Sequence, residues 1–143
     1  MTLLRSDRQV ALQQLHIALL ENADHYRDAA VFVSDTSAES CFEQLAAERE
    51  SLARDFAAEI RSTEDLPSVP DPEREEGEQF INHLSGLFAA DETGKVVAQR
   101  LQAEQQLAQM ISEQEQWLEA QDEPLLRRCQ QLVNDSIERL RAL

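Results

Sequence analysis

An all-α fold is predicted by three features of the sequence. Apolar residues recur at spacings of three, four and seven along most of the chain, which is the period of a helix. There are only three Gly and four Pro, and aromatic residues make up 5% of the chain, so Leu, Ala, Val and Ile supply most of the apolar surface. No segment has the alternating pattern of a half-buried strand. With 143 residues, 42% of them hydrophobic, we expect residues 1–143 to form a single helical bundle domain.

Two long helices are predicted in the first half of the chain. The first should begin at Ser6 or Asp7 and end near residue 33, where "SDTSAES" breaks its apolar pattern. The second is expected over about residues 36–62, because Thr36 and Glu39 have the spacing of a capping box. The short connection between them predicts an antiparallel hairpin.

A linker rich in proline and acidic residues is expected at about residues 63–72. It leads into a short helix that ends near residue 90, followed by a long helix over about residues 92–120. The last helix begins at Asp122 and forms a second antiparallel hairpin with the long one. The prediction is therefore a four-helix bundle made of two hairpins, with an extra short helix in the crossover connection. Bundles with one long crossover have the ferritin-like arrangement.

Three stretches resemble small, uncharacterised bacterial proteins of the ferritin-like superfamily: "ENADHYRDAA", "AAERE" and "DLPSVPDPERE". This resemblance implies a ferritin-like four-helix bundle. In metal-binding members, a di-iron or di-manganese centre is held by a Glu from each of two helices and a Glu-x-x-His motif from each of the other two. Carried over to this chain, the resemblance makes Glu21, Glu48 and Glu104 the candidate ligands. Both expected His ligands are missing, since Ser51 follows Glu48 where His is expected and the last helix has none.

Helix geometry adds a separate prediction about charged residues. At about 100° per residue, Arg49 lies near the centre of the apolar stripe of the second helix, and Glu104 near the centre of the stripe of the long fourth helix. Burying either charge alone would cost several kcal/mol. We therefore predict a buried ion pair between Arg49 and Glu104, at the position where metal-binding relatives hold their ions. Glu48 lies near the edge of its stripe and is expected to complete the cluster.

A metal site is the alternative interpretation of the same region. Glu21 and His25 are one turn apart on the first helix, so they form either half of a metal site or a solvated pair. Together with Glu48 and Glu104 they would bind iron or manganese. The other histidines, His16 and His83, have no acidic neighbour at ligand spacing and are expected at the surface or at its boundary.

Charge and motifs limit the classes of function. The formal charge of -15 would repel both nucleic acid and an anionic membrane. The start of the chain lacks the features of a secretory signal, and Cys41 and Cys129 have no CxxC partner, so we expect a cytoplasmic protein with reduced thiols. No nucleophile lies near a base in the sequence and no Gly-rich phosphate loop is present, which gives little support to an enzyme.

The leading hypothesis is a non-catalytic ferritin-like bundle with a structural or protein-interaction role, a lost metal centre and no cofactor. The wide apolar face of the first helix suggests a homo-oligomer. A carboxylate-rich iron or manganese protein, or an oxidase, is the alternative, and a helical adaptor that binds an unknown protein partner is a third possibility.

Overall fold

The computed structural model describes residues 4–70 and 93–143. All the regular structure in these two ranges is helical. There are four long helices: α1 (Asp7–Phe32), α2 (Thr36–Ser62), α4 (Thr93–Gln114) and α5 (Glu123–Arg141). Two short 3-10 helices, η1 (Glu115–Trp117) and η2 (Ala120–Asp122), connect α4 to α5. The predicted short helix before residue 90 lies outside the described residues.

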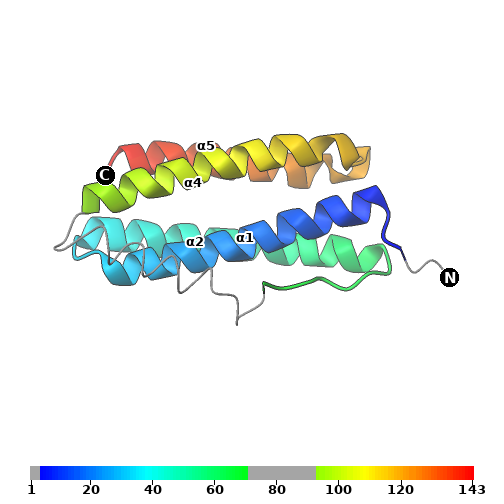
Figure 1. Cartoon of the computed structure of the whole chain (residues 1–143), viewed down its shortest axis with the longest axis horizontal. Helices are drawn as coiled ribbons and strands as arrows, with labels where there is room; N and C mark the ends of the chain where they lie inside the picture. Colours follow the sequence, from blue (N-terminus) through cyan, green and yellow to red (C-terminus); the bar gives the residue numbers. More distant parts are fainter. Residues whose placement is uncertain (1–3, 71–92) are drawn as a thin grey trace.

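The four long helices form two antiparallel hairpins that lie one on the other (Figure 1). α1 packs along α2, and α4 packs along α5. Between the hairpins, α1 contacts α4 and α2 contacts α5. α2 ends at one end of the structure and α4 begins at the other, so the chain between them connects opposite ends and α2 runs parallel to α4 (Figure 1).

Capping residues set the start of the first two helices. The Ser6 side chain accepts a hydrogen bond from the backbone N–H of Gln9, and the Gln9 side chain accepts one from the backbone N–H of Ser6. α2 begins at Thr36, as predicted, but the cap is a different residue. Asp35 accepts from the backbone N–H of Ala38, so the proposed Thr36 and Glu39 capping box is wrong.

The long fourth helix is shorter than predicted. α4 stops at Gln114 instead of about residue 120, and the chain turns through η1 and η2. The fully buried carboxylate of Asp122 fixes this turn, because it accepts a hydrogen bond from the backbone N–H of Glu119 at 3.0 Å and forms an ion pair with Arg8. These contacts hold the connection in a turn, although the apolar pattern continues through Leu118.

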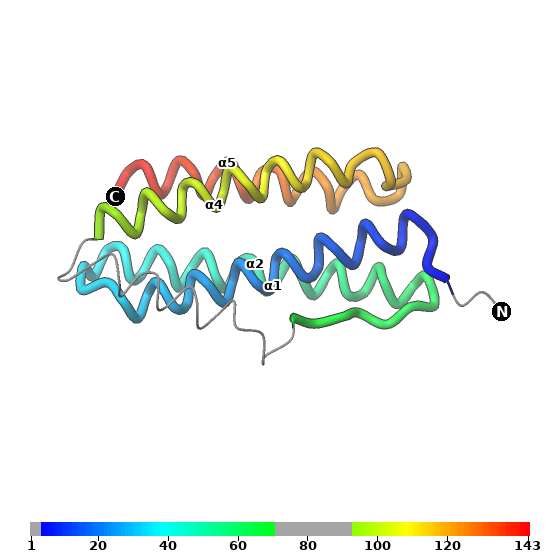
Figure 2. The backbone as a smooth tube through the Cα atoms, in the orientation of Figure 1, coloured from blue at the N-terminus to red at the C-terminus, as the bar shows by residue number. Residues whose placement is uncertain are grey.

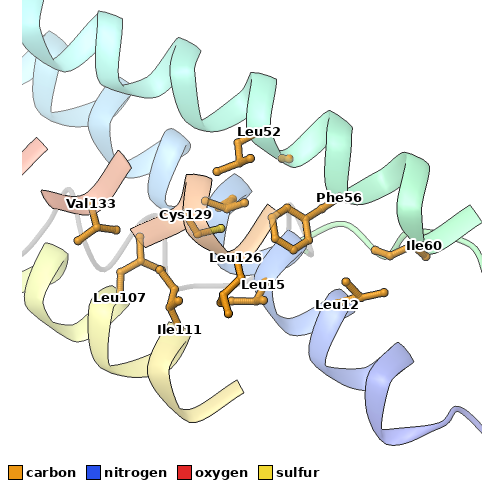
Figure 3. Close-up of a cluster of buried hydrophobic side chains, with 12 residues drawn as sticks. Leu12, Leu15, Leu52, Phe56, Ile60, Leu107, Ile111, Leu126, Cys129 and Val133 are labelled. Carbon is orange, nitrogen blue, oxygen red and sulfur yellow. The ribbon is translucent and has the colours of Figure 1, made fainter. Parts of the chain in front are cut away.

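The apolar core consists of two clusters, one toward each end of the hairpins. Figure 3 shows the cluster near the η1 and η2 end, where side chains from all four long helices meet around Phe56, Leu15, Ile111 and Cys129. The other cluster gathers around Phe42, Tyr26 and Val96. No helix among the described residues is long and apolar enough to cross a membrane.

Candidate functional site: a buried polar layer between the two core clusters

A layer of polar side chains separates the two apolar clusters. On each long helix, a polar residue stands between a residue of one cluster and a residue of the other. On α2, Arg49 lies between Leu45 and Leu52, and on α5, Ser136 lies between Val133 and Leu140. The remaining members of this polar layer are Asn22, Arg100 and Glu104, with Tyr26 at its edge. All are buried, so the layer is inside the fold and not a surface cleft.

The structure places Arg49 and Glu104 in direct contact. The Arg49 guanidinium donates through Nη2 to Oε1 of Glu104, and both side chains are 0% exposed. Arg49 also donates through Nη1 to the Ser136 hydroxyl at 3.2 Å. Its guanidinium carbon lies 4.8 Å from the centroid of the Tyr26 ring, which is a cation-π distance. Arg49 thus links α2 to α1, α4 and α5.

Glu104 is the centre of the polar layer. Its Oε1 also accepts a hydrogen bond from the Tyr26 hydroxyl, while its Oε2 is buried with no hydrogen-bond partner among the described residues. Burial raises the pKa of the Glu104 carboxyl, and Arg49, the Tyr26 hydroxyl and Arg100 oppose that shift without cancelling it. Burial also raises the pKa of Tyr26, helped by the neighbouring carboxylate, so its hydroxyl stays protonated and acts as a donor.

Arg100 is a second buried cation in this layer, and the sequence interpretation missed it. It is 2% exposed, and its guanidinium carbon lies 5.2 Å from the Tyr26 ring centroid. Burial lowers its pKa. The available signal was its spacing, because Arg100 precedes Glu104 by one helical turn and so shares its face. The Tyr26 ring is therefore contacted by two guanidinium groups.

The candidate metal ligands are not brought together. No group of three or more His, Cys, Asp or Glu side chains suited to a metal ion occurs within the described ranges, which contain Glu21, His25, Glu48 and Glu104. Glu21 and His25 are half-buried on α1.

The expectation that Glu48 completes the buried cluster is wrong. Glu48 lies on the outer face of α2, with 45% of its side chain exposed, and pairs with Arg139 of α5 at 2.8 Å. Its neighbour Arg49 fills the central interior position, and a rotation of about 100° per residue places Glu48 at the edge of the buried stripe, where it reaches Arg139.

The histidine and cysteine predictions have mixed outcomes. His16 is 4% exposed, so its predicted surface or boundary position is wrong, and His83 lies outside the described residues. Cys41 is half-buried and Cys129 fully buried, and neither forms a disulfide. Burial raises the pKa of the Cys129 thiol to about 12, so it is not a poised nucleophile.

A second ionic cluster also escaped the sequence interpretation. Arg8, near the start of α1, donates through Nε and Nη2 to the two oxygens of Asp122 at 2.8 and 2.7 Å, and through Nη2 to Glu59 of α2. Burial tends to raise the pKa of Asp122, but hydrogen bonds from Arg8 and from the Glu119 backbone outweigh it and hold that pKa below its usual value. This cluster ties both hairpins together at one end of the molecule.

Chemically, the polar layer is suited to holding helices in register. Its charged groups pair with one another and bond to Tyr26 and Ser136, and the layer is sealed between apolar clusters. Arg49 Nε and Glu104 Oε2 are buried without a hydrogen-bond partner among the described residues. Comparison of the chain with protein-family models, with curated proteins and with solved structures finds no match.

Proposed function

We propose that this protein is a non-catalytic, ferritin-like helical bundle with a structural or protein-interaction role. The helix order supports the ferritin-like assignment, because two hairpins are joined by a connection between opposite ends, with α2 parallel to α4. A ferritin-like bundle uses the middle of its core for metal ligands. In this chain the corresponding depth holds the polar layer.

The observation that carries the proposal is the pairing inside this layer. The buried carboxylate of Glu104 is occupied by the Arg49 guanidinium and by the Tyr26 hydroxyl, which leaves it no role as a metal ligand. Coulomb repulsion from the Arg49 guanidinium also disfavours a divalent metal ion beside this carboxylate. The Arg49 guanidinium stabilises the fold in the way that a bound metal ion would. It neutralises the Glu104 carboxylate and links α2 to α4.

Metal analysis tests this proposal directly. Protein purified without a metal-affinity tag, then incubated with ferrous iron or manganese and desalted, is expected to retain far less than one ion per chain by elemental analysis. Retention of about two ions per chain, lost in a Glu104→Gln variant, would instead support the iron or manganese alternative. The Glu123→Gln variant is the matched control, since Glu123 is a surface carboxylate paired with Arg127 and is not a candidate ligand.

Self-association is the interaction this proposal favours. Several large apolar side chains are exposed on the described surface: Val10, Val31, Leu66, Val69 and Trp117. Exposed apolar surface of this kind is often covered by a second copy or another protein. Much of the broad apolar face of α1 is already covered by the rest of the chain. The proposal of a homo-oligomer therefore rests on the exposed apolar residues and not on that face as a whole.

The acidic charge makes nucleic acid and anionic membranes poor partners, and we place the protein in the cytoplasm.

Sedimentation equilibrium is expected to show a homo-oligomer whose average mass rises with concentration. Replacing Leu66 and Val69 by Ser should weaken association, whereas Leu4→Ser, which changes another exposed residue near the chain start, serves as the control. A monomer at all concentrations would contradict the homo-oligomer.

A further inference from the structure

The segment after α2 returns along the first hairpin without forming a helix or strand. The chain leaves α2 at Ser62 and reverses at Glu64, whose φ of 64° lies in the left-handed region. Residues 65–70, here called the strap, then run alongside α1 (Figure 2). The strap exposes the side chains of Leu66 and Val69, which are 77% and 69% accessible.

The backbone of the strap is held by side chains of α1. Gln13 donates through Nε2 to the carbonyl of Leu66 at 2.6 Å and accepts at Oε1 from the backbone N–H of Ser68 at 2.8 Å. His16, one turn further along α1, bonds through Nδ1 to the carbonyl of Ser68 at 2.8 Å. Ser68 therefore has both backbone polar groups bonded to α1, as a residue paired in a sheet would. Gln13 and His16 are 3% and 4% exposed, so the strap covers them.

The hydrogen bond to Ser68 fixes the tautomer of His16. A carbonyl oxygen can only accept, so Nδ1 carries the proton of the neutral ring, and a second proton would go to Nε2 of a side chain that is 4% exposed. Within residues 4–70 and 93–143, the charged groups that face this region from the elements packed against α1 are Arg61 of α2 and Asp65 of the strap. Asp65 is already engaged by Arg5 and Gln13. A second proton on the ring would thus create a buried cation near Arg61, with the nearby carboxylate already paired.

We propose that the strap is an acid-sensitive latch, held on α1 by Gln13 and neutral His16 and released when His16 takes up a proton. Release moves Leu66 and Val69 away from α1 and uncovers the polar side chains beneath the strap. Proton uptake by His16 would therefore change the position of the exposed apolar side chains of the strap.

The direction of the pH dependence follows from the environment of His16. Burial lowers the pKa of His16, and Arg61 lowers it further, although the bond to the Ser68 carbonyl acts in the opposite sense. With the strap open, His16 is solvated and its pKa returns to its usual value of about 6.5. Above that pH both states are neutral and the latch is fully stable. As the pH falls below it, only the open state binds the proton, so the latch weakens.

Amide hydrogen exchange followed by NMR tests the latch in the intact protein. Between pH 7.5 and 5.5 the protection factor of the Ser68 amide should fall by up to about tenfold, the limit that one proton sets over this range. The Phe56 amide in the core of α2 should keep its protection. The fall should begin near the usual His pKa of about 6.5, which applies to the open state, while the His16 ring of the closed protein should titrate at a lower pH.

Variants separate the latch from general acid effects. His16→Asn keeps a donor nitrogen near the position of Nδ1 but cannot titrate, and it should remove the pH dependence at Ser68. His25→Gln, at the half-buried histidine further along α1, should leave it unchanged. The proposal is overturned if Ser68 protection is constant with pH in the unmodified protein, if it falls together with that of Phe56, or if the same fall persists in His16→Asn.

Discussion

Glu104→Leu is expected to lower the free energy of unfolding by more than Arg49→Leu, which should itself cost about 3 to 5 kcal/mol. Arg49→Leu leaves the buried Glu104 carboxylate with the Tyr26 hydroxyl and a nearby Arg100, so part of its stabilisation survives. Glu104→Leu leaves the buried Arg49 guanidinium without its carboxylate and the buried Tyr26 hydroxyl without its acceptor. An unpaired buried charge is costly because its lost hydration is not replaced. Urea unfolding of the three proteins measures both losses.

The double variant tests whether Arg49 and Glu104 stabilise the fold as a pair. Arg49→Leu combined with Glu104→Leu should recover much of the loss, because the pair is removed as a unit and replaced by apolar volume. Recovery should be incomplete, since the buried Tyr26 hydroxyl still loses its acceptor, Glu104. Glu48→Leu, which breaks an exposed pair with Arg139, should change stability by only about 0.5 kcal/mol. Single losses no larger than this control, or losses that simply add in the double variant, would refute a coupled buried pair.

The helices and the charged centre were predictable because both depend on local periodicity. A charged residue at the centre of an apolar stripe interrupts a regular pattern and is therefore visible in the sequence. Arg49 and Glu104 both interrupt their stripes in this way. A buried charge needs an opposite charge, so two exceptions at similar depth predict a pair. Arg100 was missed because only Glu104 was compared with its stripe, although the two are one turn apart on α4.

Features that depend on tertiary contacts were not predictable in this way. The end of α4 is set by the buried carboxylate of Asp122, whose partner Arg8 is 114 residues away in the sequence. His16 was predicted to lie at the surface or its boundary because it has no acidic neighbour at ligand spacing, but the strap covers it and bonds to it through its backbone. The order of side chains along the sequence does not indicate which of them will form a hydrogen bond with the backbone of a distant segment. The ferritin-like assignment rests on the resemblance and on helix order, and stays a prediction.

Arg8→Ala is expected to destabilise the protein by about 3 kcal/mol, because it leaves the buried Asp122 carboxylate with only the Glu119 backbone N–H and no cation. The Asp122 side chain is 0% exposed, so water cannot replace the lost partner. Arg127→Ala is the matched control, since Arg127 pairs with Glu123 at the surface of α5 and its side chain is 74% exposed. That exposed pair should contribute about 0.5 kcal/mol or less.

The effect of Arg8→Ala should also shrink in acid. Because the pKa of Asp122 is lowered in the fold, the pair contributes its full stability above the usual Asp value of about 3.9. That contribution is lost as the pH falls through the lowered, folded value, where the carboxylate is protonated and the ion pair with Arg8 disappears. Urea unfolding at neutral and acidic pH should therefore show the unmodified protein and the Arg8→Ala variant converging in stability. A difference that stays constant down to pH values well below the usual Asp value, or one no larger than that of Arg127→Ala, would mean that Arg8 stabilises the fold by packing and not by its charge.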